Sequence, residues 1–206
     1  MTTEESRTSG GSIKVVVYSD YIWPYCYIGL DRAERLKQDY GVEVEWKAFE
    51  IRPGTPLEGI PRHQKPGEGS ELSPSVKSLS DEVGLQMKRP AFVACSRPAL
   101  EAAEYAKEQS KFDEFHLAIF KAYWEEGKNI GLINILRDIA EKCGLNGDEL
   151  EHRLDEGQYT EKIDEQNEEA RLLGINGVPA YIVGGYLIEG AQPYEIFQRA
   201  IRSNPF

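Results

Sequence analysis

Cys26 is the residue whose type and surroundings best suit covalent chemistry. It follows Trp23, Pro24 and Tyr25, where the apolar run at 15–17 gives way to a polar pair and then to a helical pattern. Proline suits the first position of a helix, so Trp23 would be the N-cap and Cys26 the third helical residue. Unpaired backbone N–H groups and the positive end of the helix dipole favour a thiolate there. The stretch therefore predicts a reactive cysteine.

The elements around this stretch predict a βαβ unit. Residues 13–19 form a nearly continuous apolar run, typical of a strand buried on both faces. A helix is expected over 24–40, with Gly41 placed to end it. Residues 42–49 alternate between apolar and polar, which is the period of a half-buried strand. Two parallel strands joined by a helix form a right-handed unit.

A family resemblance rests on the same residues. DsbA-type oxidoreductases of the thioredoxin superfamily, in particular the FrnE-like branch, carry Cys-Pro-x-Cys-Tyr-Ile-Gly after their first strand. The matching residues here are Trp23, Pro24, Tyr25, Cys26, Tyr27, Ile28 and Gly29. The glutathione-using relatives, 2-hydroxychromene-2-carboxylate isomerases and kappa-class glutathione transferases, carry Ser-Pro-Tyr-Ser. The chain resembles this group but departs from both patterns at Trp23, which stands where the nucleophile would be.

The order of the remaining elements fits this resemblance. Residues 50–72 are rich in proline, glycine and charge, and predict a long loop. Helical patterns follow at about 74–87, 97–109, 111–126, 131–143 and 147–173, the last broken near Gly157. A strand near 180–183, a hairpin at Gly184 and Gly185, a strand over 186–188 and a helix over 194–202 complete the chain.

The pattern predicts an α/β protein: a thioredoxin fold with an inserted all-helical domain. We expect a flexible tail at 1–12, a thioredoxin-like domain from 13–49 and 174–206, and an inserted loop and helical domain over 50–173. The resemblance implies that the Val178–Pro179 peptide is cis, that it faces the active-site helix, and that the strand beginning near Ala180 lies beside the one ending near Ser19.

Composition excludes several classes of function. The 206 residues carry 35 acidic and 24 basic side chains, a net charge of -11, so nucleic acid and anionic membranes are not expected partners. The N-terminus has no apolar signal region and the chain no transmembrane run, which predicts a soluble, cytoplasmic protein. The cysteines Cys26, Cys95 and Cys143 lack metal-ligand spacing and form no disulfide framework, so no metal site is expected.

Each candidate residue has a structural alternative. Cys26 occupies the position of the family's resolving cysteine and, without a partner, can be a small core residue. Cys95 could be exposed, and would pair with Cys26 only if their Cα atoms lay within about 7 Å; Cys143 lies on an apolar stripe and is expected to be buried. His116 lies beside an aromatic stripe, typical of a core histidine. Trp23 has three alternative interpretations. Its indole offers an aromatic face to a ligand, or it fills the site in a non-catalytic relative, or its codon is UGA and specifies selenocysteine in the natural protein.

The resemblance implies a thiol or disulfide substrate and a groove for it. The leading interpretation is a thiol–disulfide oxidoreductase relative in which Cys26 alone gives at most monothiol activity. The alternatives are a glutathione-dependent isomerase or transferase, and a non-catalytic peptide-binding module. No cofactor is expected, although glutathione is a candidate co-substrate between residues 23–26 and Val178-Pro179, with Arg52 as a source of balancing charge. Because the glutathione-using relatives are homodimers, pairing through the helical domain is also expected.

Overall fold

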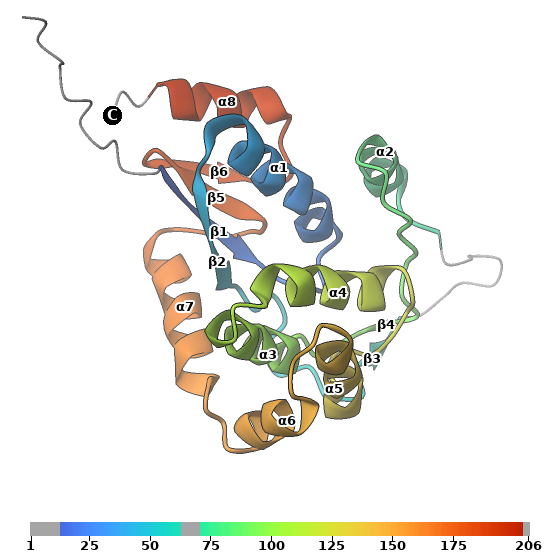
Figure 1. Ribbon diagram of the computed structural model, residues 1–206. Helices are drawn as coiled ribbons and strands as arrows, with labels where there is room; N and C mark the ends of the chain where they lie inside the picture. The colour runs from blue at the N-terminus through green and yellow to red at the C-terminus, as the bar shows by residue number, and fades with distance from the viewer. Residues whose placement is uncertain (1–12, 63–70, 204–206) are drawn as a thin grey trace, which may run out of the picture.

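A four-stranded mixed sheet forms the centre of the thioredoxin-like part of the computed structural model, which describes residues 13–62 and 71–203 (Figure 1). The expected tail at 1–12 lies outside the described residues. The strand order is β2-β1-β5-β6. β1 (Lys14–Ser19) pairs in parallel with β2 (Glu43–Ala48) and antiparallel with β5 (Ala180–Val183), which pairs antiparallel with β6 (Tyr186–Glu189). Tyr18 lies opposite Ala180, which confirms the predicted neighbourhood of these strands.

Two helices cover one face of this sheet. α1 (Pro24–Tyr40) connects β1 to β2, and α8 (Tyr194–Arg202) follows β6. Their buried side chains share one apolar cluster with the sheet, including Val15, Leu36 and Phe197. Gly41 ends α1 in the left-handed conformation with φ 62°, as its position predicts. This packing fixes the N-terminus of α1 at the carboxyl end of β1.

The helical segment follows β2 and returns to the sheet at β5. Its helices are α2 (Pro74–Glu82), α3 (Arg97–Glu108), α4 (Phe112–Trp124), α5 (Ile133–Lys142), α6 (Gly147–Asp155) and α7 (Thr160–Leu172). Gly157 lies at the predicted break between α6 and α7. The helical prediction for 74–87 was too long, because α2 ends before Gly84, which has φ 73°.

The segment between β2 and α3 contains a pairing that the sequence pattern did not predict. β3 (Ile60–Pro61) and β4 (Phe92–Val93) form a two-residue antiparallel ladder inside what was expected to be loop and helix flank. The ladder brings Arg62 close to Phe92, since the Arg62 Nε donates to the Phe92 carbonyl at 3.4 Å. The loop before α2 is therefore fastened to the segment before α3.

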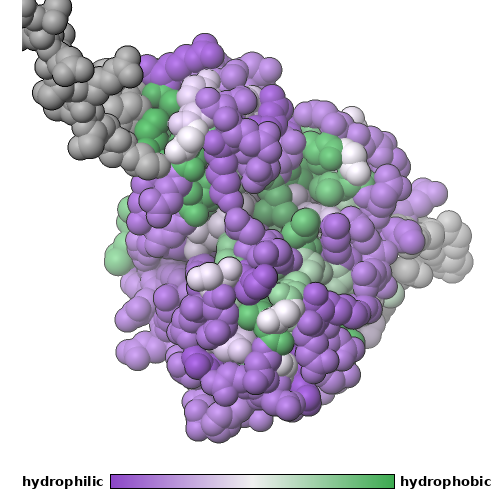
Figure 2. All heavy atoms as spheres, viewed as in Figure 1, coloured by the Kyte–Doolittle hydropathy of each residue, from purple (hydrophilic) through white to green (hydrophobic). Residues whose placement is uncertain are grey.

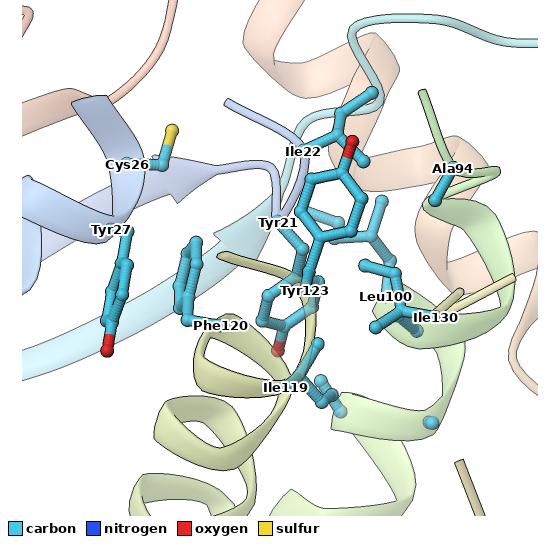
Figure 3. Packing of buried hydrophobic residues seen from close by; sticks show 14 of the residues in the cluster. Tyr21, Ile22, Cys26, Tyr27, Ala94, Leu100, Ile119, Phe120, Tyr123 and Ile130 are labelled. Carbon is cyan, nitrogen blue, oxygen red and sulfur yellow. The ribbon is translucent and has the colours of Figure 1, made fainter. Parts of the chain in front are cut away.

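The helical segment shares its core with the sheet and α1. Figure 3 shows the Tyr27 ring of α1 beside the Phe120 ring of α4, and the two rings stack with centroids 5.1 Å apart. The Trp124 indole donates to the Tyr21 carbonyl at 2.8 Å. On the far side, the Lys47 ammonium of β2 contacts the Glu169 carboxylate of α7 at 2.6 Å. These contacts hold the helices against the end of β1 where α1 begins.

Candidate functional site

Trp23 stands at the N-terminus of α1 with its side chain 39% exposed. Its backbone is extended, Pro24 follows at the first helical position, and the Cys26 N–H donates to the Trp23 carbonyl at 3.0 Å. The indole makes no side-chain hydrogen bond with any described residue, and its nearest ring neighbour is Tyr25, 6.0 Å away between centroids. Position 23 is thus an open position that the surrounding core does not require to be aromatic.

Cys26 is completely buried, and its thiol is protonated at neutral pH. Burial raises the pKa of Cys26 to about 12, although the Asp20 N–H lies 3.5 Å from the sulfur and acts in the opposite direction. The expected thiolate is therefore wrong for the chain as given. The helix N-terminus favours the charged form, but removing the sulfur from water costs more. In Figure 3 the thiol points away from the Tyr27 ring.

Asp20 is a buried carboxylate that the sequence analysis missed. It lies between β1 and Trp23 and accepts hydrogen bonds from the N–H groups of Ile22 at 3.2 Å and Ile51 at 2.8 Å, and from the Ser96 hydroxyl at 3.1 Å. Burial raises its pKa to about 6, because desolvation outweighs these three donors. The carboxylate ties the end of β1 to the segments before α2 and α3. The sequence signal that could have revealed Asp20 is an acidic residue directly after a buried strand.

The predicted cis peptide is present at Val178–Pro179. Pro179 packs against α1, since a Cβ built on Gly29 would lie 3.2 Å from the proline ring. Beside it is a groove of about 770 Å³, here named the cis-proline groove. It is lined by Trp23, Phe49, Glu50, Ile51, Asn176, Gly177, Val178, Glu189 and Gly190. The structure thus brings together Trp23 and Val178, but Arg52 is not among the lining residues.

A second groove of about 530 Å³ is also lined by Trp23. We name it the arginine groove, and it is lined by Ile22, Trp23, Pro24, Arg62, Glu71, Leu72, Ser73, Val76, Arg89 and Trp124. Pro24 contributes to this groove rather than to the cis-proline groove. The Tyr25 hydroxyl lies 3.3 Å from the Ser75 hydroxyl of α2. Trp23 is the lining residue that the two grooves share.

The other sulfur and imidazole candidates do not join this site as reactive groups. All three cysteines are free. Cys95 is buried rather than exposed, and Cys143 is only half-buried, contrary to expectation. His116 is a buried core residue as predicted: its Nδ1 lies 2.6 Å from the Tyr21 hydroxyl, whereas its Nε2 has no partner among the described residues. Within the described ranges, no cluster of metal-ligating side chains occurs and no helix could cross a bilayer.

The chain belongs to the family of DsbA-like thioredoxin domains, whose model matches residues 14–202. It is 31% identical to the uncharacterized protein YwbO of Bacillus subtilis, over 92% of this chain and 96% of YwbO. It is 24% identical to the 2-hydroxychromene-2-carboxylate isomerase of Pseudomonas putida, over 81% of this chain and 83% of that enzyme.

A solved structure has the same fold. The crystal structure of a probable DsbA oxidoreductase from Streptomyces coelicolor matches with a TM-score of 0.80 and 23% identity, covering 93% of this chain and 89% of that one. The thioredoxin fold with added helices, predicted from the order of the elements, and the relationship to DsbA-like and isomerase proteins, predicted from residues 23–29, are confirmed.

Proposed function

We propose that this DsbA-like protein binds a small thiol-bearing peptide, such as the tripeptide glutathione, in the cis-proline groove. In the chain as given it completes no dithiol–disulfide cycle. One observation carries this proposal: the exposed position at the start of α1 holds Trp23, while the thiol three residues further on, Cys26, is buried and protonated. Exchange needs one thiolate to attack a disulfide and a second thiol to release the mixed disulfide. Cys26 supplies neither an accessible thiolate nor a pair.

The backbone of Val178 supports peptide binding. Among the described residues, its N–H and C=O have no hydrogen-bond partner within the chain, although its side chain is buried. An extended peptide lying along this segment would satisfy both groups, as an added strand does at a sheet edge. The cis-proline groove therefore offers a ligand one donor and one acceptor at fixed positions.

The charges in the groove favour a zwitterionic ligand. Glu189 accepts from the Asn176 N–H at 3.2 Å and meets no cation among the described residues, whereas Glu50 contacts the Arg97 guanidinium at 3.2 Å. Glu189 would attract the ammonium group of the ligand. The N-terminus of α1 is the complementary location for a carboxylate or thiolate. Glutathione carries both kinds of group.

Two other functions belong to the same site. A glutathione-dependent isomerase or transferase needs no cysteine pair, and the relative in Pseudomonas putida is named as an isomerase. A full redox pair would form if position 23 were selenocysteine in the natural protein, and the open, unbonded indole fits a position shaped for a small exposed nucleophile. Sequencing the codon for residue 23 and measuring the mass of the native protein by mass spectrometry test the selenocysteine alternative. A cytoplasmic location and a homodimer stay predictions.

The test is a calorimetric titration of reduced glutathione into the parent protein and into Trp23→Ser. Tyr186→Ser is the control, because Tyr186 is also an exposed aromatic but lies at the far end of β6 from Glu189. Saturable binding in the parent and the control, with amide NMR shifts at Gly177 and Val178, supports the proposal. Binding only in Trp23→Ser means that Trp23 is a plug, and binding in neither removes the glutathione hypothesis.

S-methylglutathione separates thiol recognition from peptide recognition. If the sulfur is sensed by the N-terminus of α1, methylation weakens binding because the thiolate can no longer form. Equal affinity for the two ligands means that the groove recognises the peptide backbone and charges alone, which favours the non-catalytic binding module over the enzyme.

A further inference from the structure

The dipeptide Asn-Gly occurs twice in the chain, and the fold places the two copies in different surroundings. Asn146 and Gly147 begin α6, whereas Asn176 and Gly177 lie between α7 and β5, directly before the cis peptide. In such a pair the backbone nitrogen of the glycine can attack the side-chain carboxamide, because glycine has no Cβ to hinder the approach. Local structure then decides whether the two groups meet.

The first copy is held by bonds to both its side chain and its backbone. The Asn146 Oδ1 accepts from the Glu149 N–H at 3.1 Å, and the Asn146 carbonyl accepts from the Tyr105 hydroxyl at 3.3 Å. Gly147 is buried, and a Cβ built on it would lie 2.9 Å from the Glu141 carboxylate. Turning the carboxamide toward the Gly147 nitrogen would break the N-cap of α6, which stabilises the helix.

The second copy is exposed and lies in open space. The Gly177 N–H donates to no acceptor among the described residues, and a Cβ built on Gly177 would meet no atom within 4 Å. Within the described ranges the Asn176 carboxamide makes one hydrogen bond, from Nδ2 to the Gly174 carbonyl of the same segment at 2.8 Å. The chain follows the outer side of the molecule there (Figure 1), and Figure 2 shows a mainly hydrophilic surface in the same view. Attack on the carboxamide therefore requires only local rotation, in contact with water.

We propose that Asn176 is a site of spontaneous deamidation, modified in the folded protein in preference to Asn146. The Gly177 nitrogen bonds to the Asn176 Cγ and gives up its proton, while the Cγ–Nδ2 bond breaks and the amide nitrogen leaves with that proton as ammonia. A water molecule then adds to either carbonyl of the cyclic imide and opens it to aspartate or to isoaspartate. The sequence of steps consumes one water, releases one ammonia and involves no oxidation or reduction. It goes beyond the proposed function, because it requires no ligand.

The modification would change the cis-proline groove, which Asn176 helps to line. Either product places a new carboxylate beside Glu189, whose Oε1 accepts from the Asn176 N–H at 3.2 Å, and like charges this close repel each other. Isoaspartate also adds one atom to the backbone before Gly177, which displaces Val178. Because the proposed peptide ligand pairs with the backbone of Val178, the protein would lose affinity for it as isoaspartate accumulates. This effect on binding rests on the proposed function, whereas the reaction itself does not.

Peptide mass spectrometry measures both pairs in one sample. Trypsin releases residues 143–153 and 172–199 as separate peptides, each with one Asn-Gly pair. After incubation of the folded protein in mildly alkaline buffer, we expect at least about fivefold more deamidation at Asn176 than at Asn146, the factor that the free energy of a helix N-cap gives alone. In urea the two pairs should react at similar rates. Equal deamidation in the folded protein, or the same preference in urea, overturns the proposal.

Gly177→Ala is the matched variant, because its new Cβ has room in the fold but hinders the attack. It should suppress deamidation at Asn176 and leave that at Asn146 unchanged, and thermal unfolding shows whether the fold is intact. Unchanged deamidation at Asn176 in the folded variant overturns the route through the imide.

Titrating glutathione into fresh and incubated protein separates this inference from the proposed function. Weaker binding in proportion to isoaspartate supports the effect on the groove, and equal affinity refutes that effect. If Asn176 deamidates but glutathione binds neither sample, the modification site stands and the proposed function fails. Glutathione binding without deamidation at Asn176 gives the opposite result.

Discussion

Asp20 should make the stability of this protein fall as the pH rises from 4 to 7.5. Its carboxyl is completely buried, and burial raises its pKa from 3.8 to about 6. A group with a raised pKa in the folded state contributes stability that is present below its unfolded pKa and is lost as the pH rises through its folded pKa. The loss should therefore develop between about pH 4 and pH 7.

The magnitude follows from the two pKa values. Each pKa unit is worth about 1.4 kcal/mol, so ionising Asp20 inside the fold costs about 3 kcal/mol relative to ionising it in the unfolded chain. Three donors, the N–H groups of Ile22 and Ile51 and the Ser96 hydroxyl, offset part of the desolvation cost and are already included in this pKa. This net cost of about 3 kcal/mol is a large share of the free energy of unfolding of a typical domain, which is about 5–15 kcal/mol.

Urea unfolding of the parent and of Asp20→Asn at several pH values isolates this contribution. Asparagine stays neutral, so the free energy of unfolding of the parent relative to the variant should fall by about 3 kcal/mol between pH 4 and pH 7.5. If the variant loses hydrogen bonds, the difference in free energy of unfolding between parent and variant shifts by the same amount at every pH, so its pH dependence is not affected. Asp138→Asn, which changes an exposed residue of α5, is the control and should show no such trend. A difference that is flat or rises with pH would show that the three donors outweigh burial.

Three further changes test the site and its support. Trp23→Cys should create or greatly raise insulin-reduction activity, and already high activity in the parent would mean that another cysteine resolves the intermediate. Iodoacetamide should leave Cys26 unmodified in the folded protein while half-buried Cys143 reacts, as peptide mass spectrometry can show. Gly29→Ala should destabilise the fold by about 1–3 kcal/mol in urea unfolding, because the new Cβ would lie 2.3 Å from the Tyr181 hydroxyl; an unchanged midpoint would contradict this packing.

Local signals predicted the thioredoxin part of the fold well. α1 begins at Pro24 and is ended by Gly41, as expected, and Gly184 and Gly185 lie in the hairpin between β5 and β6. The apolar run before Asp20 is the central strand β1. These features depend on proline, glycine and hydrophobic periodicity, which act over a few residues.

The features that the sequence did not predict correctly depend on parts of the chain that are distant in sequence. The pKa of Cys26 is set by how many atoms from elsewhere surround it, and a motif shows only the helix dipole. Arg62 and Arg89 line the same groove because β3 pairs with β4. This ladder is only two residues long and contains Pro61, so it has no periodicity that the sequence could reveal. Position 23 was predicted as part of the site, but the two grooves that it lines could be found only in the structure.

The position of β5 in the sheet determines when the protein can finish folding during synthesis. β1 lies between β2, which follows it closely in the chain, and β5, which begins at Ala180. Until the ribosome has released β5, one edge of β1 stays unpaired, and the α1 face of the sheet lacks α8. An uncovered apolar strand edge invites pairing with other chains. We expect the nascent chain to depend on early formation of α4 against Tyr27, and to be most prone to aggregation when synthesis stalls before Val183.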